Sequence, residues 1–153
     1  EDLQIGEVII IPDGEPIIAK SAAKKPAKER AFGTGGPSYD GYYIRPIVGG
    51  RRSQGIHGFN GIDLAAPKGT IISATADGTV IVARSSGYGG GYGSYVVISH
   101  NNGTQTLSAH MSKVIVSVGD FVSQGDTIGF VGSTGKSTGN HIHFEIRGAK
   151  NPF

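Results

Sequence analysis

Two histidines separated by one residue, His141 and His143, lie in the apolar run HIHFEI at residues 141–146. Alternate residues of a β-strand face the same side, about 6.5–7 Å apart at Cα. One imidazole of the pair could therefore hold a metal ion while the other faces the water molecule that attacks a substrate. A purely structural role for the pair is the alternative at this point.

A carboxylate and a further histidine favour the metal site. Asp63 precedes the apolar segment LAAP at 64–67, where a lone carboxylate is costly to bury unless it is paired or binds a metal. His110 ends a second apolar segment. Cysteine is absent, which excludes disulfides, thiol catalysis and zinc bound by cysteine. Any zinc must therefore be bound by His, Asp or Glu side chains.

The composition favours short strands joined by tight turns as the frame for these residues. The chain has 153 residues, enough for one domain and a short appendage, and 26 of them are glycine. No apolar run reaches the length of about 18 residues typical of a membrane-spanning helix, and no segment has useful helical periodicity. We expect an all-β fold: an antiparallel sheet folded as a sandwich or an open barrel, with long glycine-rich loops.

Strands are predicted where apolar or β-branched runs are bounded by turn residues. Asn102-Gly103 is a strong hairpin signal between two of them, because both residues tolerate positive φ. The tract GYGGGYG at 87–93 is predicted to be a loop, whose tyrosines either line a substrate groove or serve only as turn residues. The predicted strands cover residues 70–74, 78–84, 95–100, 104–110, 127–131 and 141–147.

The chain is predicted to divide into three parts. Residues 1–18 form a strand fragment whose segment LQIGEVIIIP resembles the last strand of a LysM carbohydrate-binding module, with an ordinary edge strand as the alternative. Residues 19–40 have few large apolar side chains and many lysines, which indicates a basic linker, either merely solvated or weakly adhesive to an anionic polymer or membrane surface. Residues 41–153 form the folded domain. No motif for nucleic-acid binding is present, so we expect no nucleic-acid partner.

Four motifs occur in order between residues 44 and 152. They are GIDLAAPKGT at 61–70, TLSAHM at 106–111, VGDFVSQG at 118–125 and GSTGKSTGNHIHFE at 132–145. Together they resemble the motifs of lysostaphin/LytM-type zinc metallopeptidases. The resemblance implies a domain that cleaves peptide bonds in the cross-bridges or stem peptides of bacterial peptidoglycan with one zinc ion.

The resemblance also assigns roles to individual residues. Asp63 and His143 match zinc ligands of the family, and His110 and His141 match two histidines that surround the attacking water without binding the metal. Such a site is chemically coherent, since a catalytic zinc keeps three protein ligands and one open position. One histidine then accepts the proton of the water, and one stabilises the oxyanion. The sequence does not say which histidine has which role.

The third ligand departs from the family pattern. That pattern, His-x-Gly-x-Asp, would place a histidine where this chain has Phe59, which cannot bind metal. The nearest candidate is His57, six residues before Asp63. Positions 57 and 59 project to one side of an extended backbone, and Gly58 gives the backbone freedom to bring His57 onto the metal. We therefore expect His57 to be the third metal ligand; the alternative is a surface histidine beside an incomplete site.

Several other residues carry smaller expectations. Ser108 and Asn140 stand where the family often has tyrosine and proline, which bears on substrate fit rather than on the chemistry. His100 resembles a family histidine outside the metal shell, and we expect it to be structural. Glu145 could orient a ligating imidazole. Exposed arginines, Arg45 or Arg51, could meet a substrate carboxylate, although such arginines are common.

The predicted function is that of a zinc endopeptidase of the bacterial cell wall. One alternative is a non-catalytic member that binds and regulates other wall hydrolases, which the loss of a ligand at Phe59 would suggest. Another is a wall-binding module with a structural zinc, which would need four protein ligands. A peptidoglycan substrate implies a secreted, periplasmic or wall-associated protein. We expect a monomer with no obligatory protein partner.

Overall fold

The structure, a computed structural model, describes residues 36–153. The predicted strand at 1–18, with its likeness to a LysM module, and the predicted linker as far as residue 35 lie outside the described residues. Where the description starts, the backbone N–H of Lys150 donates to the carbonyl of Pro37 at 2.9 Å, and Gly36 lies against the backbone of Ala149. A domain boundary at residue 41 stays a prediction.

The described residues form nine strands and one short 3-10 turn, η4, so the prediction of an all-β fold is confirmed. Residues 36–153 contain no helix that is both long enough and apolar enough to cross a membrane. The elements are β1 (Arg51–His57), β2 (Gly61–Ala65), β3 (Ile71–Ser73), β4 (Gly78–Arg84), η4 (Gly89–Gly91), β5 (Ser94–His100), β6 (Gln105–Val114), β7 (Phe121–Val122), β8 (Thr127–Val131) and β9 (His141–Arg147).

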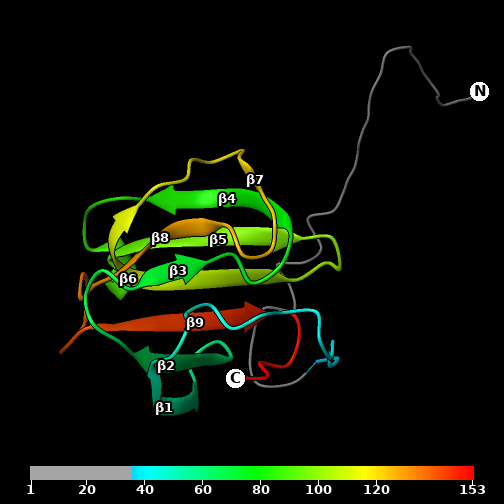
Figure 1. The fold of residues 1–153 in the computed structure, drawn as a ribbon, viewed down its shortest axis with the longest axis horizontal. Helices are drawn as coiled ribbons and strands as arrows, with labels where there is room; N and C mark the ends of the chain where they lie inside the picture. The colour runs from blue at the N-terminus through cyan, green and yellow to red at the C-terminus, as the bar shows by residue number, and fades with distance from the viewer. Residues whose placement is uncertain (1–35) are drawn as a thin grey trace, which may run out of the picture.

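The strands pair antiparallel in one open sheet, in the order β1-β2-β9-β6-β5-β4-β7 (Figure 1). The short strand β8 pairs with both β6 and β3, so the sheet branches at β6 and folds over itself. The branch point is a single residue. β6 pairs with β9 as far as Ala109, opposite His143, and with β8 from Met111, opposite Val131. His110 stands between the two pairings.

The main core lies between the two parts of the folded sheet. Ile72 of β3 and Ile128 of β8 join Ile98 of β5 in one cluster of buried side chains. β9 puts its apolar residues into this core and its polar residues on the opposite face, because successive side chains of a strand alternate. The core residues of β9 are Ile142, Phe144 and Ile146. The candidate residues His141, His143 and Glu145 therefore share the opposite face.

All six predicted strands are present, and the hairpin at Asn102-Gly103 joins β5 to β6, with Gly103 at φ 85°. Three strands were not predicted. β1 is polar and exposed, as an edge strand can be, while β2 and β7 are short. One predicted boundary was wrong: the strand expected to end at His110 continues to Val114. The reason is that β6 changes its partner from β9 to β8 at His110 and continues beside the new strand.

Candidate metal and catalytic site

The register between β2 and β9 brings two of the predicted ligands face to face. Asp63 pairs directly with His143, and the Nδ1 atom of His143 lies 2.8 Å from the Oδ1 atom of Asp63. Ile62 and Leu64 on either side of Asp63 are fully buried in the main core, so the alternation of β2 directs the carboxylate to the opposite face. Two strands far apart in the sequence thus build one half of the site.

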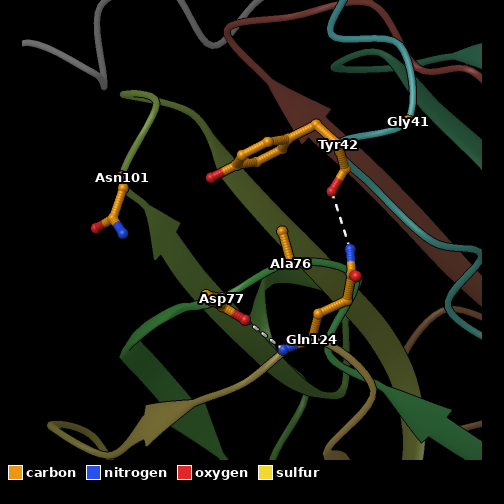
Figure 2. Close-up of a pocket in the computed structure, with 6 residues that line it drawn as sticks. All are labelled: Gly41, Tyr42, Ala76, Asp77, Asn101 and Gln124. Atoms are coloured by element: carbon orange, nitrogen blue, oxygen red, sulfur yellow. Dashed lines mark hydrogen bonds between the residues drawn. The ribbon is translucent and has the colours of Figure 1, made fainter.

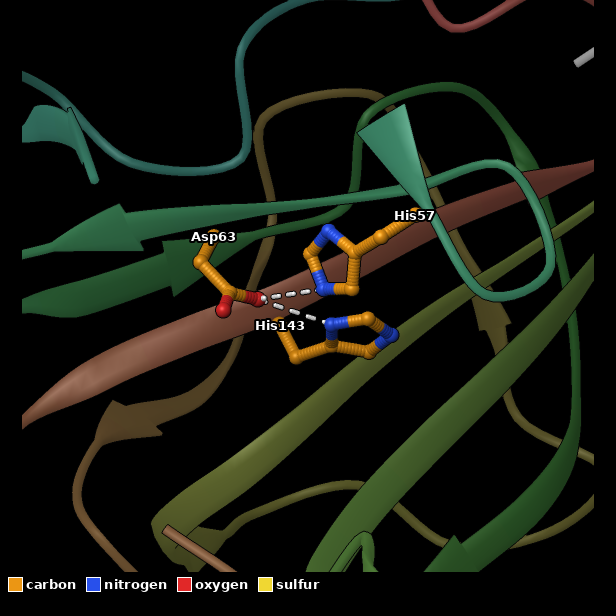
Figure 3. A group of neighbouring side chains, drawn as sticks. All are labelled: His57, Asp63 and His143. Atoms are coloured by element: carbon orange, nitrogen blue, oxygen red, sulfur yellow. Dashed lines mark hydrogen bonds and ion pairs between the residues drawn. The ribbon is translucent and has the colours of Figure 1, made fainter. Parts of the chain in front are cut away.

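His57 completes the group from β1. Its Nε2 atom lies 3.4 Å from Oδ1 of Asp63, and its ring centroid is 5.0 Å from that of His143. One possible ligand atom from each of His57, Asp63 and His143 lies within 4.8 Å of the others. Figure 3 shows both imidazoles directed at the same carboxylate oxygen.

The reason given for His57 from the sequence was wrong in one respect. Residues 58–60 do not continue an extended segment; they form the turn between β1 and β2, with Gly58 at φ 57° and Asn60 at φ 64°. The turn pairs His57 with Gly61, two residues from Asp63. Hairpin pairing therefore brings His57 to Asp63, while Phe59 lies at the turn, 42% exposed.

Asn60 anchors this turn to the body of the domain. It is buried, and its side-chain amide donates hydrogen bonds to the carbonyl oxygens of Ile146 and Ala149. Its own carbonyl accepts a hydrogen bond at 3.0 Å from the side-chain amide of Asn151. Asparagine also tolerates the left-handed backbone conformation found here. The residue fixes the turn, and with it the position of His57.

Backbone carbonyls fix the rings of three histidines in the same way. The Nδ1 atoms of His57, His110 and His141 lie 2.5, 2.8 and 2.9 Å from the carbonyl oxygens of Gly55, Thr134 and Gly139. A carbonyl oxygen can only accept a hydrogen bond, so in each ring Nδ1 carries the hydrogen. When such a ring is neutral, its Nε2 atom keeps a lone pair that can bind a metal or a proton.

His110 and His141 lie together beside the three-residue group. Their ring centroids are 4.7 Å apart, and Nε2 of His141 is 3.8 Å from Oδ2 of Asp63. His110 has φ 61°, a backbone conformation that is uncommon for residues other than glycine and that occurs often at functional sites. Burial is the main cause that lowers the pKa of His110, so this ring is neutral near pH 7.

His143 is held differently, between two carboxylates. Its Nε2 atom lies 3.1 Å from Oε1 of Glu145, on the side away from Asp63. Burial by itself lowers the pKa of His143, but the hydrogen bonds to Asp63 and Glu145 outweigh burial and raise that pKa to about 9. Burial raises the pKa of Asp63, and the hydrogen bond and charge of His143 reverse this, so the pKa is lowered overall.

Two residues hold Glu145 in turn. The hydroxyl of Tyr92 donates to Oε1 at 2.6 Å, and Nε of Arg147 donates to Oε2 at 2.6 Å. The hydrogen bonds of His143, Tyr92 and Arg147 overcome the effect of burial and lower the pKa of Glu145. Burial, followed by the hydrogen bond to Glu145, raises the pKa of Tyr92 to about 12. Sequence reasoning did not assign a role to Arg147 and placed Tyr92 only among loop tyrosines.

The donor set fits a divalent zinc ion. Two imidazole nitrogens and one carboxylate oxygen form the type of ligand set that catalytic zinc sites use, with one position left open. The charges agree, since Glu145 is paired with Arg147, whereas the partly buried carboxylate of Asp63 faces the imidazoles of His57, His141 and His143. His57, Asp63 and His143 would hold the ion.

The other predicted residues lie apart from this group. His100 is buried, with Nδ1 at 2.8 Å from the carbonyl oxygen of Asp77 and Nε2 at 2.9 Å from the hydroxyl of Thr106. Arg45 donates to the carbonyl of Gly50 at 3.4 Å. The remaining predicted residues are Arg51, which is exposed, Ser108, which is buried on β6, and Asn140, which is exposed before β9.

One pocket borders the candidate site, and another lies apart from it. One, of about 240 Å³, is lined by Lys68, Ser112, Ser133, Thr134 and Asn140. It borders the paired histidines, because Thr134 bonds to His110 and Asn140 precedes His141. A second pocket, of about 320 Å³, is enclosed in part by Tyr42, Asp77 and Gln124 (Figure 2). Its lining contains none of the predicted site residues.

The chain is similar to known proteins over most of residues 36–153. Residues 57–153 match the family described as Peptidase family M23. Over 107 residues, or 70% of the chain, it is 47% identical to the DD-carboxypeptidase/endopeptidase Mpg of Neisseria meningitidis serogroup B, of which it covers 23%. Over 87 residues, or 57% of the chain, it is 44% identical to the peptidoglycan DD-endopeptidase ShyA of Vibrio cholerae, of which it covers 20%. The chain thus spans about a fifth of the length of these curated relatives.

Solved structures of peptidases are also similar to this chain. A zinc-containing peptidase from Vibrio cholerae has a TM-score of 0.54 at 36% identity, over 77% of this chain and 37% of that one. The catalytic domain of lysostaphin from Staphylococcus simulans also has a TM-score of 0.54, at 33% identity, over 71% of this chain and 84% of that one.

Proposed function

The chain belongs to peptidase family M23, and from this premise we propose that residues 41–153 act as a zinc-dependent endopeptidase on bacterial peptidoglycan. The observation that carries the proposal is the convergence of ligand atoms from His57, Asp63 and His143 within 4.8 Å. The names of two relatives, a DD-carboxypeptidase/endopeptidase and a peptidoglycan DD-endopeptidase, support the choice of substrate. A peptidoglycan substrate implies action outside the cytoplasm.

A zinc ion held there supplies Lewis-acid chemistry, polarising a carbonyl and making water nucleophilic near neutral pH. The protein contributes His110 and His141, whose ring centroids lie 4.7 Å apart beside the ligand group. One neutral Nε2 accepts a proton from the attacking water and later passes it to the leaving amine. The second ring, after taking a proton from solvent at Nε2, donates a hydrogen bond to the developing oxyanion. Their Nδ1 hydrogen bonds to Thr134 and Gly139 keep both rings in position.

The pocket beside the two histidines offers a place for part of the substrate. Lys68 is its one charged lining residue, and it forms no ion pair within residues 36–153. The hydroxyls of Ser112 and Ser133 and the amide of Asn140 line the same pocket. A cation among hydroxyl and amide groups suits a carboxylate. We propose that a carboxylate of the substrate peptide binds here.

A non-catalytic regulator of other hydrolases finds less support. That alternative rested on Phe59 standing where the family has a ligand, and the hairpin turn brings Nε2 of His57 to 3.4 Å from Oδ1 of Asp63. A structural zinc also finds less support, because such sites use four protein ligands and the group offers three among the described residues.

The test is hydrolysis of purified cell walls, followed by turbidity, with the protein in zinc-free and zinc-supplemented forms. We expect turbidity to fall only with zinc, and mass spectrometry of the released fragments to show cleaved peptides with intact glycan strands. Defined peptide dimers and monomers distinguish endopeptidase from carboxypeptidase action. A zinc-loaded protein that leaves walls and peptides intact, while Asp63→Ala behaves identically, would contradict the proposal.

A further inference from the structure

We propose that Glu145, braced by Tyr92 and Arg147, is a positioning residue that decides which ring nitrogen of His143 faces the metal. The inference rests on the proposed metallopeptidase function and extends it to residues outside the ligand set. All three residues contact one another or His143, and none of them is a ligand in the group of His57, Asp63 and His143.

Glu145 is built into the sheet as a fully used carboxylate. It is 1% exposed, on the same face of β9 as His143. Its Oε1 atom accepts hydrogen bonds from Tyr92 at 2.6 Å and from Nε2 of His143 at 3.1 Å, while Oε2 accepts one from Arg147 at 2.6 Å. Arg147 also reaches the hydroxyl of Tyr92 at 3.2 Å. The paired charge of Arg147 makes an ionised carboxylate tolerable at this depth.

An ionised carboxylate only accepts hydrogen bonds, so Nε2 of His143 must carry a hydrogen. The nitrogen left to bind metal is then Nδ1, the atom that lies 2.8 Å from Asp63. The other histidines of the site show the opposite arrangement, because backbone carbonyls fix their Nδ1 atoms and leave Nε2 free. Glu145 therefore supplies for His143 what a carbonyl supplies for the others, with the two nitrogens exchanged.

The ring of His143 is closely packed by Gly61 and Tyr92. A Cβ atom at Gly61 would lie 2.6 Å from Cε1 of His143 and 3.2 Å from Cγ of Glu145, so only glycine fits on the adjoining strand. Tyr92 stacks against the ring of His143, with centroids 5.9 Å apart and an interplanar angle of 29°. Tyr92 comes from the glycine-rich loop, which this contact ties to the site.

The decisive measurement is zinc affinity, by competition with a chromophoric chelator, on the full 153-residue chain and on Glu145→Gln. The glutamine keeps the size of the side chain but removes its charge and offers a competing donor. Loss of a residue that orients a metal ligand typically weakens binding about 10- to 100-fold, and we expect a weakening in this range. Tyr92→Phe, which keeps the stacked ring and removes only the hydroxyl, should weaken binding less.

Tyr43→Phe is the matched control. Tyr43 is a buried tyrosine whose hydroxyl bonds to Thr104 at 2.6 Å and to Asn102 at 3.2 Å, at the β5–β6 hairpin rather than at the site. We expect it to lose stability much as Tyr92→Phe does while keeping wild-type zinc affinity. Long-range ¹H–¹⁵N spectra of the zinc-loaded protein add a readout independent of activity: Nε2 of His143 should carry a slowly exchanging hydrogen in the wild type and a rapidly exchanging one in Glu145→Gln.

Wild-type zinc affinity and wild-type Nε2–H exchange in Glu145→Gln would overturn the inference. Equal losses of affinity in Tyr92→Phe and Tyr43→Phe would do the same, and this pair decides the matter if Glu145→Gln does not fold. A wild-type protein that binds zinc but cleaves no peptide defeats the proposed function alone. A wild-type protein that binds no zinc defeats both.

Discussion

His100 and His110 are buried to nearly the same extent, 4% and 6% exposed, in neighbouring strands of one sheet. Each donates from Nδ1 to a backbone carbonyl at 2.8 Å, and burial is the main cause that lowers each pKa. They differ in Nε2. That of His100 is bonded to the hydroxyl of Thr106, whereas no hydrogen bond to Nε2 of His110 occurs within residues 36–153.

The difference separates a histidine that is hydrogen-bonded at both ring nitrogens from one that is bonded at a single nitrogen. A buried polar group is normally satisfied by the protein, and His100 follows that rule. Around His110 the free ring nitrogens of His57 and His141 converge on the carboxylate of Asp63. The buried side-chain atoms without a hydrogen-bond partner among residues 36–153 are Oδ1 of Asn60 and Oγ1 of Thr75, so the unbonded Nε2 of His110 is open to solvent, and we expect metal and substrate to bind around it.

The largest effect is expected from removing Asp63 or His143 from the group of candidate metal ligands. Asp63→Ala and His143→Ala should abolish zinc binding and all hydrolysis, because each removes one of the three protein donors that converge within residues 36–153. Elemental analysis after dialysis measures the metal, expected at about one zinc per wild-type chain. Full zinc content in both variants would show that the metal lies elsewhere.

The next prediction separates His57 from Phe59. If the hairpin turn supplies the third ligand, His57→Ala should release the metal and end activity, while Phe59→His should change little. Circular dichroism is the control for the fold. A wild-type chain that is metal-free at micromolar zinc, yet binds zinc after Phe59→His, would revive the alternative of a non-catalytic regulator.

The paired histidines should show a loss of chemistry without a loss of metal. We expect His110→Asn and His141→Ala each to keep zinc and to lower the rate of peptide hydrolysis about 10²- to 10⁴-fold. Asparagine is chosen at position 110 because it tolerates the φ of 61° better than alanine does. Steady-state kinetics on a defined peptide dimer give the rate, and a wild-type rate in either variant would remove that residue from the mechanism.

The sequence predicted the features of this site that depend on neighbouring residues better than those that depend on contacts between distant segments. The strand around His141 and His143 was predictable, since alternation is local. The position of His57 beside Asp63 was expected, but for the wrong reason, because a turn with two left-handed residues replaces the extended segment. Tyr92 and Arg147 could not be assigned, since their contacts with Glu145 depend on how a distant loop meets β9. The one signal was the tyrosine-rich glycine loop, which was predicted to line a groove or to serve as turn residues; the hydroxyl of Tyr92 donates to Glu145.

A smaller effect on hydrolysis is expected from changing Lys68, in the pocket beside His110 and His141. Lys68→Met should lower kcat/KM roughly tenfold on a peptide with a free carboxylate, because one charge-assisted hydrogen bond is lost. On the same peptide with that carboxylate amidated, kcat/KM should not change. Lys113→Met is the control, because Lys113 is exposed on β6 and does not line this pocket. Equal losses on both peptides would place the carboxylate elsewhere.

The smallest effect on catalysis is expected at His100, the satisfied member of the pair. His100→Asn removes a ring that bonds at both ends, leaving the carbonyl of Asp77 and the hydroxyl of Thr106 without their present partner. Such losses cost about 1–3 kcal/mol of unfolding free energy for each buried group left unsatisfied, measurable by urea denaturation. Because His100 lies outside the ligand group, zinc content and kcat of the folded fraction should stay at wild-type values. The same substitution at His110 should have the converse result, with stability changed less than activity. If His100→Asn lowered kcat as His110→Asn does while the protein stayed folded, the free Nε2 atom would not be what distinguishes the two histidines.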